Sequence, residues 1–248
     1  MRSFLTAICF SLICHSTWAE TAVPVAPPLP PPPPEWDGSA EATALITSGN
    51  AKNTTLGFGG RLNYKPLPWS FRTSFNYLIS TSGPVTNAES FDALLRTERD
   101  FSPDIGPYGQ LTYLTNVFTG FNARYAGEVG ASLRLVQREE HRLNSELGIG
   151  AISEDRTDNL DQSFATLRMA FEYGWKLTAN TEFTAGLSIL ENLNNLSDWR
   201  LSNSYNFTTV LTKILSMRVG FRVDHLNKPV PGKLQTDTTT TASLVAKF

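Results

Sequence analysis

The chain ends with TDTTTTASLVAKF, residues 236–248, in which small or apolar side chains alternate with polar ones. Successive side chains of a β-strand point to opposite faces, so Leu244, Ala246 and Phe248 share one face. Apolar side chains at alternate positions are typical of strands that face lipid in membrane barrels. We interpret the stretch as the closing strand of such a barrel, with Leu244, Ala246 and Phe248 as the assembly signal for the barrel-assembly machinery.

The same alternation continues back through the sequence. Between turn clusters lie segments of about ten to fifteen residues with a period of two, as where Leu56, Phe58 and Leu62 oppose Thr55 and Arg61. We identify twelve such segments, an even number, which predicts an all-β fold: a closed antiparallel transmembrane β-barrel of about 12 strands. The predicted starts are Gly38, Asn53, Ser70, Glu89, Tyr108, Ala123, Leu143, Ser163, Thr181, Asp198, Leu215 and Asp237.

The connections between these segments support a barrel in an outer membrane. Such barrels have short turns on the periplasmic side and longer loops on the outer side. The connections after even-numbered strands are mostly short: 65–68, 138–142, 178–180 and 212–214. Those after odd-numbered strands are often longer and more polar: 80–88, 153–162, 191–197 and 225–236. A closed barrel leaves no unpaired edge, so we expect the last strand to pair with Ser39 to Ile46.

A soluble β-sandwich also alternates, but its strands are typically shorter and its outer faces richer in charge. Here the polar face holds mostly Ser, Thr, Asn, Gly and sparse charges of both signs. Aromatic side chains also fall at both predicted rims, as in the aromatic girdles of membrane barrels. Those predicted at the periplasmic rim are Tyr64, Trp69, Trp175 and Phe248; those at the outer rim are Phe118, Phe164 and Trp199.

The N-terminal part predicts export. Residues 1–19 have a basic start, a short apolar stretch and a small-residue cleavage site, as in a signal peptide. The apolar stretch is too short for a transmembrane helix. Residues 20–36 form a proline-rich periplasmic linker whose partner the sequence does not identify, and residues 37–248 form the barrel. Both cysteines lie in the predicted signal, and the net charge of −2 argues against nucleic-acid binding.

Several stretches resemble a known family. They are GSAEATALITSGNAKNTTLGFGGRLNY (38–64), LNSELGIGAISE (143–154), YGWKLT (173–178) and GKLQTDTTTTASLVAKF (232–248). Together they are similar to the YdiY-like family of salt-induced outer membrane proteins, a domain of unknown function. The resemblance covers nearly all of the chain after the proline run. It implies a barrel in the outer membrane of a Gram-negative bacterium, with no catalytic or ligand-binding residues to carry over.

The inward face carries the residues that could have a function. The predicted lumen-lining residues are Arg61, Arg72, Arg124, Glu128, Arg134, Glu146, Arg168, Glu172, Arg218 and Arg222. They could set the selectivity of a pore, or they could form structural ion pairs that fill a narrow barrel. Twelve strands lie between the sizes that favour each alternative.

The sequence predicts no catalytic, cofactor-binding or metal site. Asp224 and His225 are adjacent, but neighbours on a strand point to opposite faces. We therefore expect a non-enzymatic outer-membrane barrel, in contact with lipid, that contributes to envelope adaptation to salt or osmotic stress. The salt link comes only from the resemblance. The alternative is a narrow porin for small solutes or ions, and the third hypothesis is an outer-membrane enzyme.

Overall fold

A computed structural model of the chain describes residues 35–47, 53–82 and 84–248. The predicted signal peptide (1–19) and all but the last two residues of the predicted linker (20–36) lie outside the described residues. Within the described ranges, no helix is long and apolar enough to cross a membrane.

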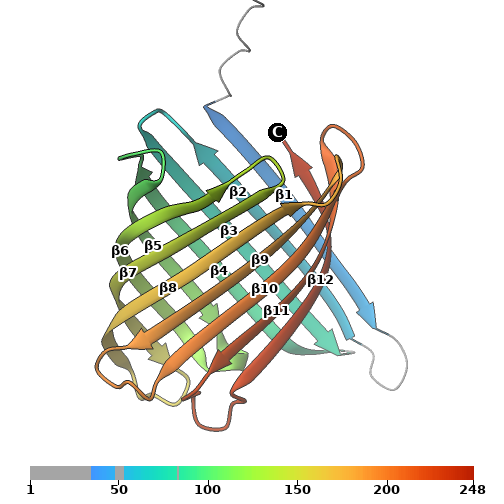
Figure 1. Ribbon diagram of the computed structural model, residues 1–248. Coiled ribbons are helices and arrows are strands. Elements are labelled where there is room, and N and C mark those ends of the chain that lie inside the picture. Colours follow the sequence, from blue (N-terminus) through green and yellow to red (C-terminus); the bar gives the residue numbers. More distant parts are fainter. Residues whose placement is uncertain (1–34, 48–52, 83) are drawn as a thin grey trace, which may run out of the picture. The chain divides into compact units, whose positions relative to one another are not determined.

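The described chain forms one closed antiparallel barrel (Figure 1). Each strand pairs with its neighbours in sequence, and the last pairs with the first. The predicted barrel of twelve strands is confirmed, and every strand begins within four residues of its predicted start. The strands are β1 (Trp36–Thr47), β2 (Asn53–Tyr64), β3 (Trp69–Ser82), β4 (Val85–Arg99), β5 (Ile105–Asn116), β6 (Phe121–Gln137), β7 (His141–Arg156), β8 (Gln162–Lys176), β9 (Thr181–Asn192), β10 (Trp199–Val210), β11 (Leu215–Leu226) and β12 (Thr236–Lys247).

The two ends of the barrel differ. β1 begins and β12 finishes at the end that is uppermost in Figure 1, which we call the terminal end; the opposite end is the loop end. The turns 138–140 and 211–214 lie at the terminal end, and the longer connections 193–198 and 227–235 lie at the loop end. A 3-10 turn, η1 (Val117–Thr119), joins β5 to β6 at the loop end.

One predicted loop, 80–88, is wrong. β3 continues to Ser82 and β4 already begins at Val85, with a shift in register between Ser80 and Thr81. The segment is polar, which favoured a loop. Strand pairing, however, uses only main-chain groups, so polar side chains do not prevent it. The two strands therefore extend beyond the predicted loop boundary.

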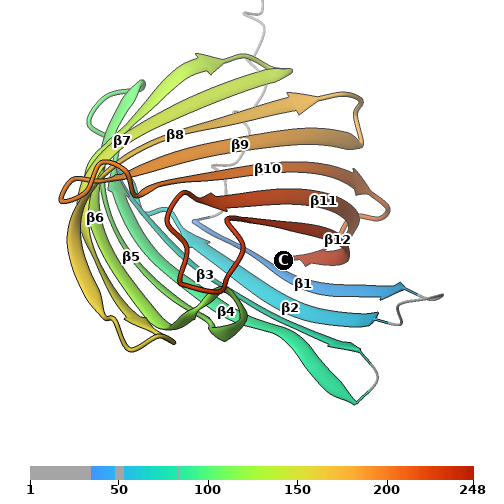
Figure 2. The same cartoon turned by 90° about the horizontal axis from the view of Figure 1, so that it is seen from below.

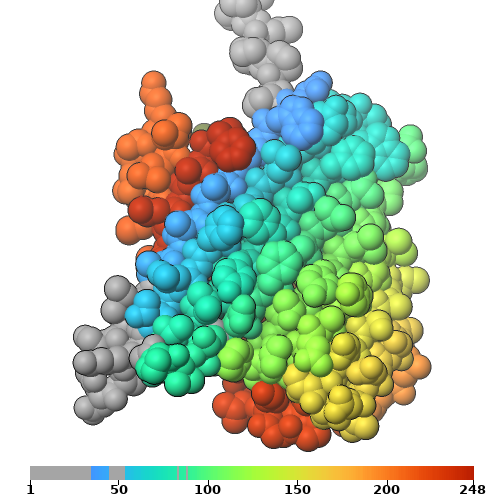
Figure 3. Space-filling view, turned by 180° about the vertical axis from the view of Figure 1, so that it is seen from behind, coloured from blue at the N-terminus to red at the C-terminus, as the bar shows by residue number. Residues whose placement is uncertain are grey.

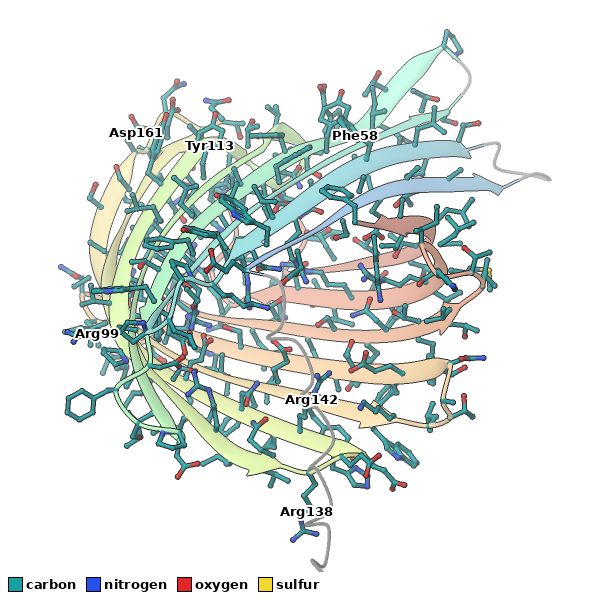
Figure 4. All side chains as sticks on the ribbon, turned by 90° about the horizontal axis from the view of Figure 1, so that it is seen from above. Phe58, Arg99, Tyr113, Arg138, Arg142 and Asp161 are labelled. Carbon is teal, nitrogen blue, oxygen red and sulfur yellow. The ribbon has the colours of Figure 1, made fainter. Side chains whose placement is uncertain are left out.

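Large apolar side chains lie on the outside of the wall. Leu56, Phe58, Leu111 and Ile149 are each more than half exposed. The oblique rows of side chains on this outer surface are visible in Figure 3, and Tyr113 points away from the interior in Figure 4. A soluble protein rarely exposes so large an apolar surface, whereas a membrane barrel presents it to lipid.

The interior is polar. Glu154, Thr166, Ser216 and Ser243 are each no more than 4% exposed. A soluble β-sandwich would bury its apolar side chains and expose its polar ones. The observed distribution is the reverse, so the alternative of a soluble sandwich is excluded.

The seam between β1 and β12 is short. It consists of five paired positions, from Ser39 with Lys247 to Thr43 with Ser243. The predicted pairing as far as Ile46 is therefore wrong beyond Thr43. From Thr43 toward the loop end, β1 stays paired with β2 and β12 with β11, so the two hairpins separate in that direction.

Phe248 extends this seam at the terminal end. Its N–H donates to the carbonyl of Gly38 at 3.0 Å, and the N–H of Gly38 donates back at 2.8 Å. Its ring lies over Gly38, where a Cβ would come within 2.4 Å of Phe248 Cε2. The glycine therefore makes room for the aromatic ring on the outer face of the seam.

Deleting Phe248 should reduce the fraction of chain that folds into a barrel. The deletion removes two backbone hydrogen bonds, each contributing about 1 kcal/mol, together with the ring contact on Gly38. The folded fraction can be measured by gel mobility before and after boiling. Phe101→Ala is the matched control, because Phe101 is 80% exposed in the turn between β4 and β5. Equal folded fractions for the deletion and the control would contradict this role for the last residue.

Candidate functional site in the lumen

The ten predicted lumen-lining residues share the inner face of the wall. Residues that pair directly across neighbouring strands share a face, and the register places all ten with side chains that line an internal cavity. Side chains project into the interior from around the wall in Figure 4, which is a view from the terminal end. They separate into a central network, a cluster at the loop end and a group of more exposed charges. The ten residues are Arg61, Arg72, Arg124, Glu128, Arg134, Glu146, Arg168, Glu172, Arg218 and Arg222.

Arg168 of β8 organises the central network, which we define as Arg96, Tyr108, Glu128, Glu146 and Arg168. Its Nε donates to Glu128 at 2.9 Å, and its Nη2 donates to Tyr108 at 3.2 Å and to Glu146. Tyr108 also donates its hydroxyl proton to Glu128. Arg96 of β4 reaches Glu146 of β7 at 2.9 Å. The network therefore ties five successive strands together inside the barrel.

A pair of glycines makes room for this network. Gly130 of β6 lies directly opposite Gly148 of β7. A Cβ at Gly148 would lie 2.5 Å from both Glu128 Oε1 and the hydroxyl of Tyr108, which is closer than van der Waals contact allows. The Tyr108 hydroxyl and the Glu128 carboxylate therefore lie directly over this glycine.

Toward the terminal end, the chain of ion pairs continues through Glu98. Arg96 contacts Glu98 at 2.9 Å, and Arg134 contacts the same carboxylate at 3.1 Å. Arg134 also pairs with Asp100 in the turn after β4. Arg96, Glu98 and Tyr108 were not among the predicted residues. They lie on the inner face of β4 and β5, so extending the period-two pattern along those strands could have found them.

The loop-end cluster consists of Arg124, Glu154, Asp198 and Arg200. Glu154 has a fully buried side chain; it contacts Arg124 at 2.8 Å and also accepts a hydrogen bond from Arg200. Arg200 lies 3.5 Å from Asp198. Of these four residues only Arg124 was predicted. Two arginines thus share one buried carboxylate beneath the mouth of the barrel.

Apolar side chains surround this cluster. Phe121, Ile152, Phe164 and Val230 are each no more than 6% exposed. The prediction that Phe164 faces lipid at the outer rim is wrong. Phe164 has the same strand parity as Arg168 and faces inward, where the guanidinium of Arg200 lies 5.1 Å from its ring centroid. A cation held against a ring in a desolvated site is stabilising, which accounts for an aromatic residue inside the barrel.

The connection between β11 and β12, residues 227–235, crosses the mouth of the barrel; we call it the mouth loop. Figure 2, seen from the loop end, shows it in red extending over the interior. Its Val230 packs on Gly120 of the β5–β6 connection, where a Cβ would come within 2.5 Å of Val230 Cγ2. Lys233 Nζ donates to the carbonyl of Val117 at 3.3 Å. Because β5 and β6 lie across the ring from β11 and β12, the mouth loop spans the opening.

A second set of charges is less constrained. Arg218 of β11 contacts Glu41 of β1 at 2.6 Å, and Arg72 of β3 donates to the side chain of Asn63 at 3.2 Å. Among the described residues, neither Arg61 nor Arg72 has a carboxylate within ion-pair distance. Both side chains are exposed, although they face the lumen. The wall formed by β2 and β3 therefore presents to water two arginines that, among the described residues, are not held in ion pairs.

Arg222 of β11 forms an ion pair with Asp224, at 2.7 Å, on the same strand. Asp92 of β4 lies on the inner face of another part of the wall, where it accepts a hydrogen bond from Asn76 at 2.9 Å. These charges extend the polar lining of the lumen toward the loop end.

A cavity of about 390 Å³ lies in the lumen and reaches the terminal ends of β3, β4, β6 and β7. It is lined from seven strands: by Arg72, Arg96, Arg134 and Arg168, by Glu98, Glu146 and Glu172, by Asn144, and by Ser70, Ser132, Ser188, Ser202 and Ser204. Charged and hydroxyl groups of this kind hydrogen-bond water or a small polar solute. The lumen is therefore braced by ion pairs but is not filled by them.

The two histidines of the barrel have structural surroundings. His225 stacks on Trp199, with ring centroids 4.9 Å apart, and its Nδ1 lies 2.8 Å from the hydroxyl of Thr236. Asp224, its neighbour in sequence, pairs instead with Arg222. His141 lies 2.8 Å from the hydroxyl of Tyr173. Over residues 35–47, 53–82 and 84–248, no group of His, Cys, Asp and Glu could hold a metal ion.

Comparison with known proteins identifies a family and a relative of the chain. Residues 40–248 match the model of a family described as "Protein of unknown function, DUF481". The chain is 22% identical over 210 residues to the "Uncharacterized protein YdiY" of Escherichia coli (strain K12), covering 84% of this chain and 82% of that protein.

Two solved structures show the same architecture. The COG4313 outer membrane channel from Pseudomonas putida F1 has a TM-score of 0.51 and 10% identity, covering 86% of this chain and 95% of that one. The NanC porin has a TM-score of 0.50 and 9% identity, covering 86% of this chain and 97% of that one. At such identities the likeness concerns the fold.

Proposed function

The chain belongs to the DUF481 family of proteins of unknown function, and we propose that it is a non-enzymatic channel for small hydrophilic solutes in the outer membrane of a Gram-negative bacterium. The observation that carries the proposal is the cavity of about 390 Å³ in the lumen, with charged and hydroxyl side chains along its wall. A barrel that served only as a membrane anchor would need no polar cavity of this size. Exposed Arg61, Arg72 and Glu172 supply the charges that would act on a passing ion.

The orientation follows from the connections. The terminal end has the shorter turns and would face the periplasm, and the loop end would face outward. The apolar outer wall would contact membrane lipid. The last strand, with Leu244, Ala246 and Phe248 outward, would be recognised by the barrel-assembly machinery.

The described conformation corresponds to a channel with a closed outer mouth. Val230 of the mouth loop and the buried loop-end cluster lie between the cavity and the outside. Conduction would require the mouth loop to move, because the buried side chains around Glu154 leave that end of the lumen filled. A channel that stays mostly closed fits a role in envelope adaptation to salt or osmotic stress, for which the family resemblance supplies the salt link.

Recordings in a planar lipid bilayer test the channel. We expect discrete current steps from the purified full chain. In Arg168→Gln the carboxylates of Glu128 and Glu146 lose their shared cation, so the reversal potential in a salt gradient should shift toward cation selectivity. Arg99→Gln is the matched control, because Arg99 lies outside the lumen with its guanidinium 5.5 Å from the ring centroid of Trp69 (Figure 4). Silence of the full chain, and also of variants with a released mouth loop, would overturn the proposal.

A further inference from the structure

We propose that the cavity in the lumen is a binding site for a small polyhydroxylated carboxylate. The proposal rests on the channel function and names the class of solute that the channel holds. It is carried by an arginine without a carboxylate partner, by a set of hydroxyl groups on the opposite wall and by the access to the cavity.

The first observation concerns Arg72. Four arginines and three glutamates line the cavity. Arg96, Arg134 and Arg168 are all paired with carboxylates. Among the described residues Arg72 has no such partner, and its only hydrogen bond, to Asn63, uses Nε and leaves both terminal nitrogens free. Within the described ranges, Arg72 is therefore the lining arginine whose guanidinium is not held by a carboxylate.

The position of Arg72 makes an anion favourable there. Arg72 lies directly opposite Arg96 across the β3–β4 pair. Like charges in directly opposed positions destabilise a sheet. Arg96 is held by Glu98 and Glu146, so it cannot move away from this arrangement without breaking ion pairs. A bound carboxylate would relieve the repulsion and would meet the planar fork of Arg72 with two parallel hydrogen bonds.

The second observation concerns the opposite wall. Ser188, Ser202 and Ser204 of β9 and β10 line the cavity, and β9 lies across the ring from β3. Each hydroxyl both donates and accepts, which is the pattern that sugar-like hydroxyls require. Glu172 is exposed in the same cavity and adds an acceptor. A ligand with a carboxylate at one end and several hydroxyls along the rest satisfies both walls.

The third observation concerns access and size. Ser70, Arg134 and Asn144 line the cavity and lie close to the terminal ends of their strands, so a ligand reaches it from that side. The mouth loop closes only the other end. The volume of about 390 Å³ lies within the range of small-molecule pockets. Binding therefore does not require the mouth loop to open.

Isothermal titration of the full, refolded chain in detergent at low salt tests the site. The probes are gluconate, which has both features; sorbitol, which lacks the carboxylate; and acetate, which lacks the hydroxyls. We expect gluconate to bind at least tenfold more tightly than either of the others. Arg72→Gln should weaken gluconate binding roughly 10- to 100-fold, because it removes a charged hydrogen-bonding partner. Arg99→Gln, outside the lumen, should leave the affinity unchanged.

The folded fraction of Arg72→Gln, measured by heat-dependent gel mobility, should equal that of the unaltered chain, because Arg72 forms no ion pair with any residue that the structure describes. Equal affinity for gluconate and sorbitol, or full affinity in Arg72→Gln, would overturn the assignment. The titration measures binding and does not depend on ionic current. The binding site and the channel function can therefore be contradicted independently of each other. Gluconate binding in a chain that never conducts would remove the channel and leave the site, whereas current steps without gluconate binding would remove the site and leave the channel.

Discussion

Glu154→Leu should lower the free energy of unfolding by about 3–5 kcal/mol, the cost of breaking a buried ion pair by removing one partner. The side chain of Glu154 is fully buried, and it compensates both Arg124 and Arg200. Without it, two neighbouring guanidinium groups remain in the desolvated loop end, where Asp198, 3.5 Å from Arg200, is the remaining acidic residue of the cluster. The repulsion between these two guanidinium groups adds to the free-energy cost of their desolvation, which the carboxylate of Glu154 no longer offsets.

Unfolding by urea in lipid vesicles, followed by tryptophan fluorescence, measures this effect. Glu182→Leu is the matched control, because Glu182 also pairs with an arginine, Arg142, but both side chains are more than a third exposed. Exposed pairs of this kind contribute about 0–1 kcal/mol. Glu154→Gln should have an intermediate effect, since the amide can still accept one hydrogen bond. Similar losses in the Glu154 and Glu182 variants would show that the loop-end cluster is not the stabilising feature we infer.

The second large effect should come from Val230 of the mouth loop. Val230 is 2% exposed and packs on Gly120, which has a φ of +100°. Burial of a valine contributes about 1.5–3 kcal/mol, so Val230→Ser should favour the open mouth by roughly tenfold or more. We expect a larger open probability of the channel in bilayer recordings.

Limited trypsin digestion gives a second readout that does not depend on current. Cleavage after Lys233 should accelerate when the mouth loop is released. Leu234→Ser is the control, because Leu234 belongs to the same loop but is 79% exposed. Unchanged cleavage and unchanged open probability in Val230→Ser would contradict the closing role of the loop.

The alternation of side chains was enough to predict the barrel and the inner face because a membrane barrel separates two environments residue by residue. The partners of the inward charges could not be predicted. Arg168 reaches Glu128 two strands away, and Arg96 reaches Glu146 three strands away. Which charges meet depends on the tilt and shear of the strands, and a period of two contains no information about shear.

The errors have related causes. Phe164 follows the inward parity of its strand, but aromatic residues near strand ends are usually assigned to the lipid interface. Inside the barrel, the guanidinium of Arg200 gives the ring of Phe164 a favourable partner, so the ring need not face lipid. Arg200 lies far from Phe164 in the sequence, so the pattern of a single strand does not indicate this contact. The end of the seam at Thr43 depends on how two hairpins diverge, which neither strand shows by itself. Long-range geometry therefore accounts for what the pattern did not predict.

The short seam also bears on how barrels of this kind could change size in evolution. Strands are gained or lost as hairpins, and a new hairpin must enter at a joint between two existing strands. The β1–β12 joint has five paired positions, whereas the β1–β2 joint has twelve. Insertion at the seam would disrupt the fewest backbone pairs and would leave the central network and the loop-end cluster intact, since both lie on β4 to β10. A barrel with more strands could therefore arise here with both charge clusters retained, at the loss of the Arg218–Glu41 pair that crosses the seam.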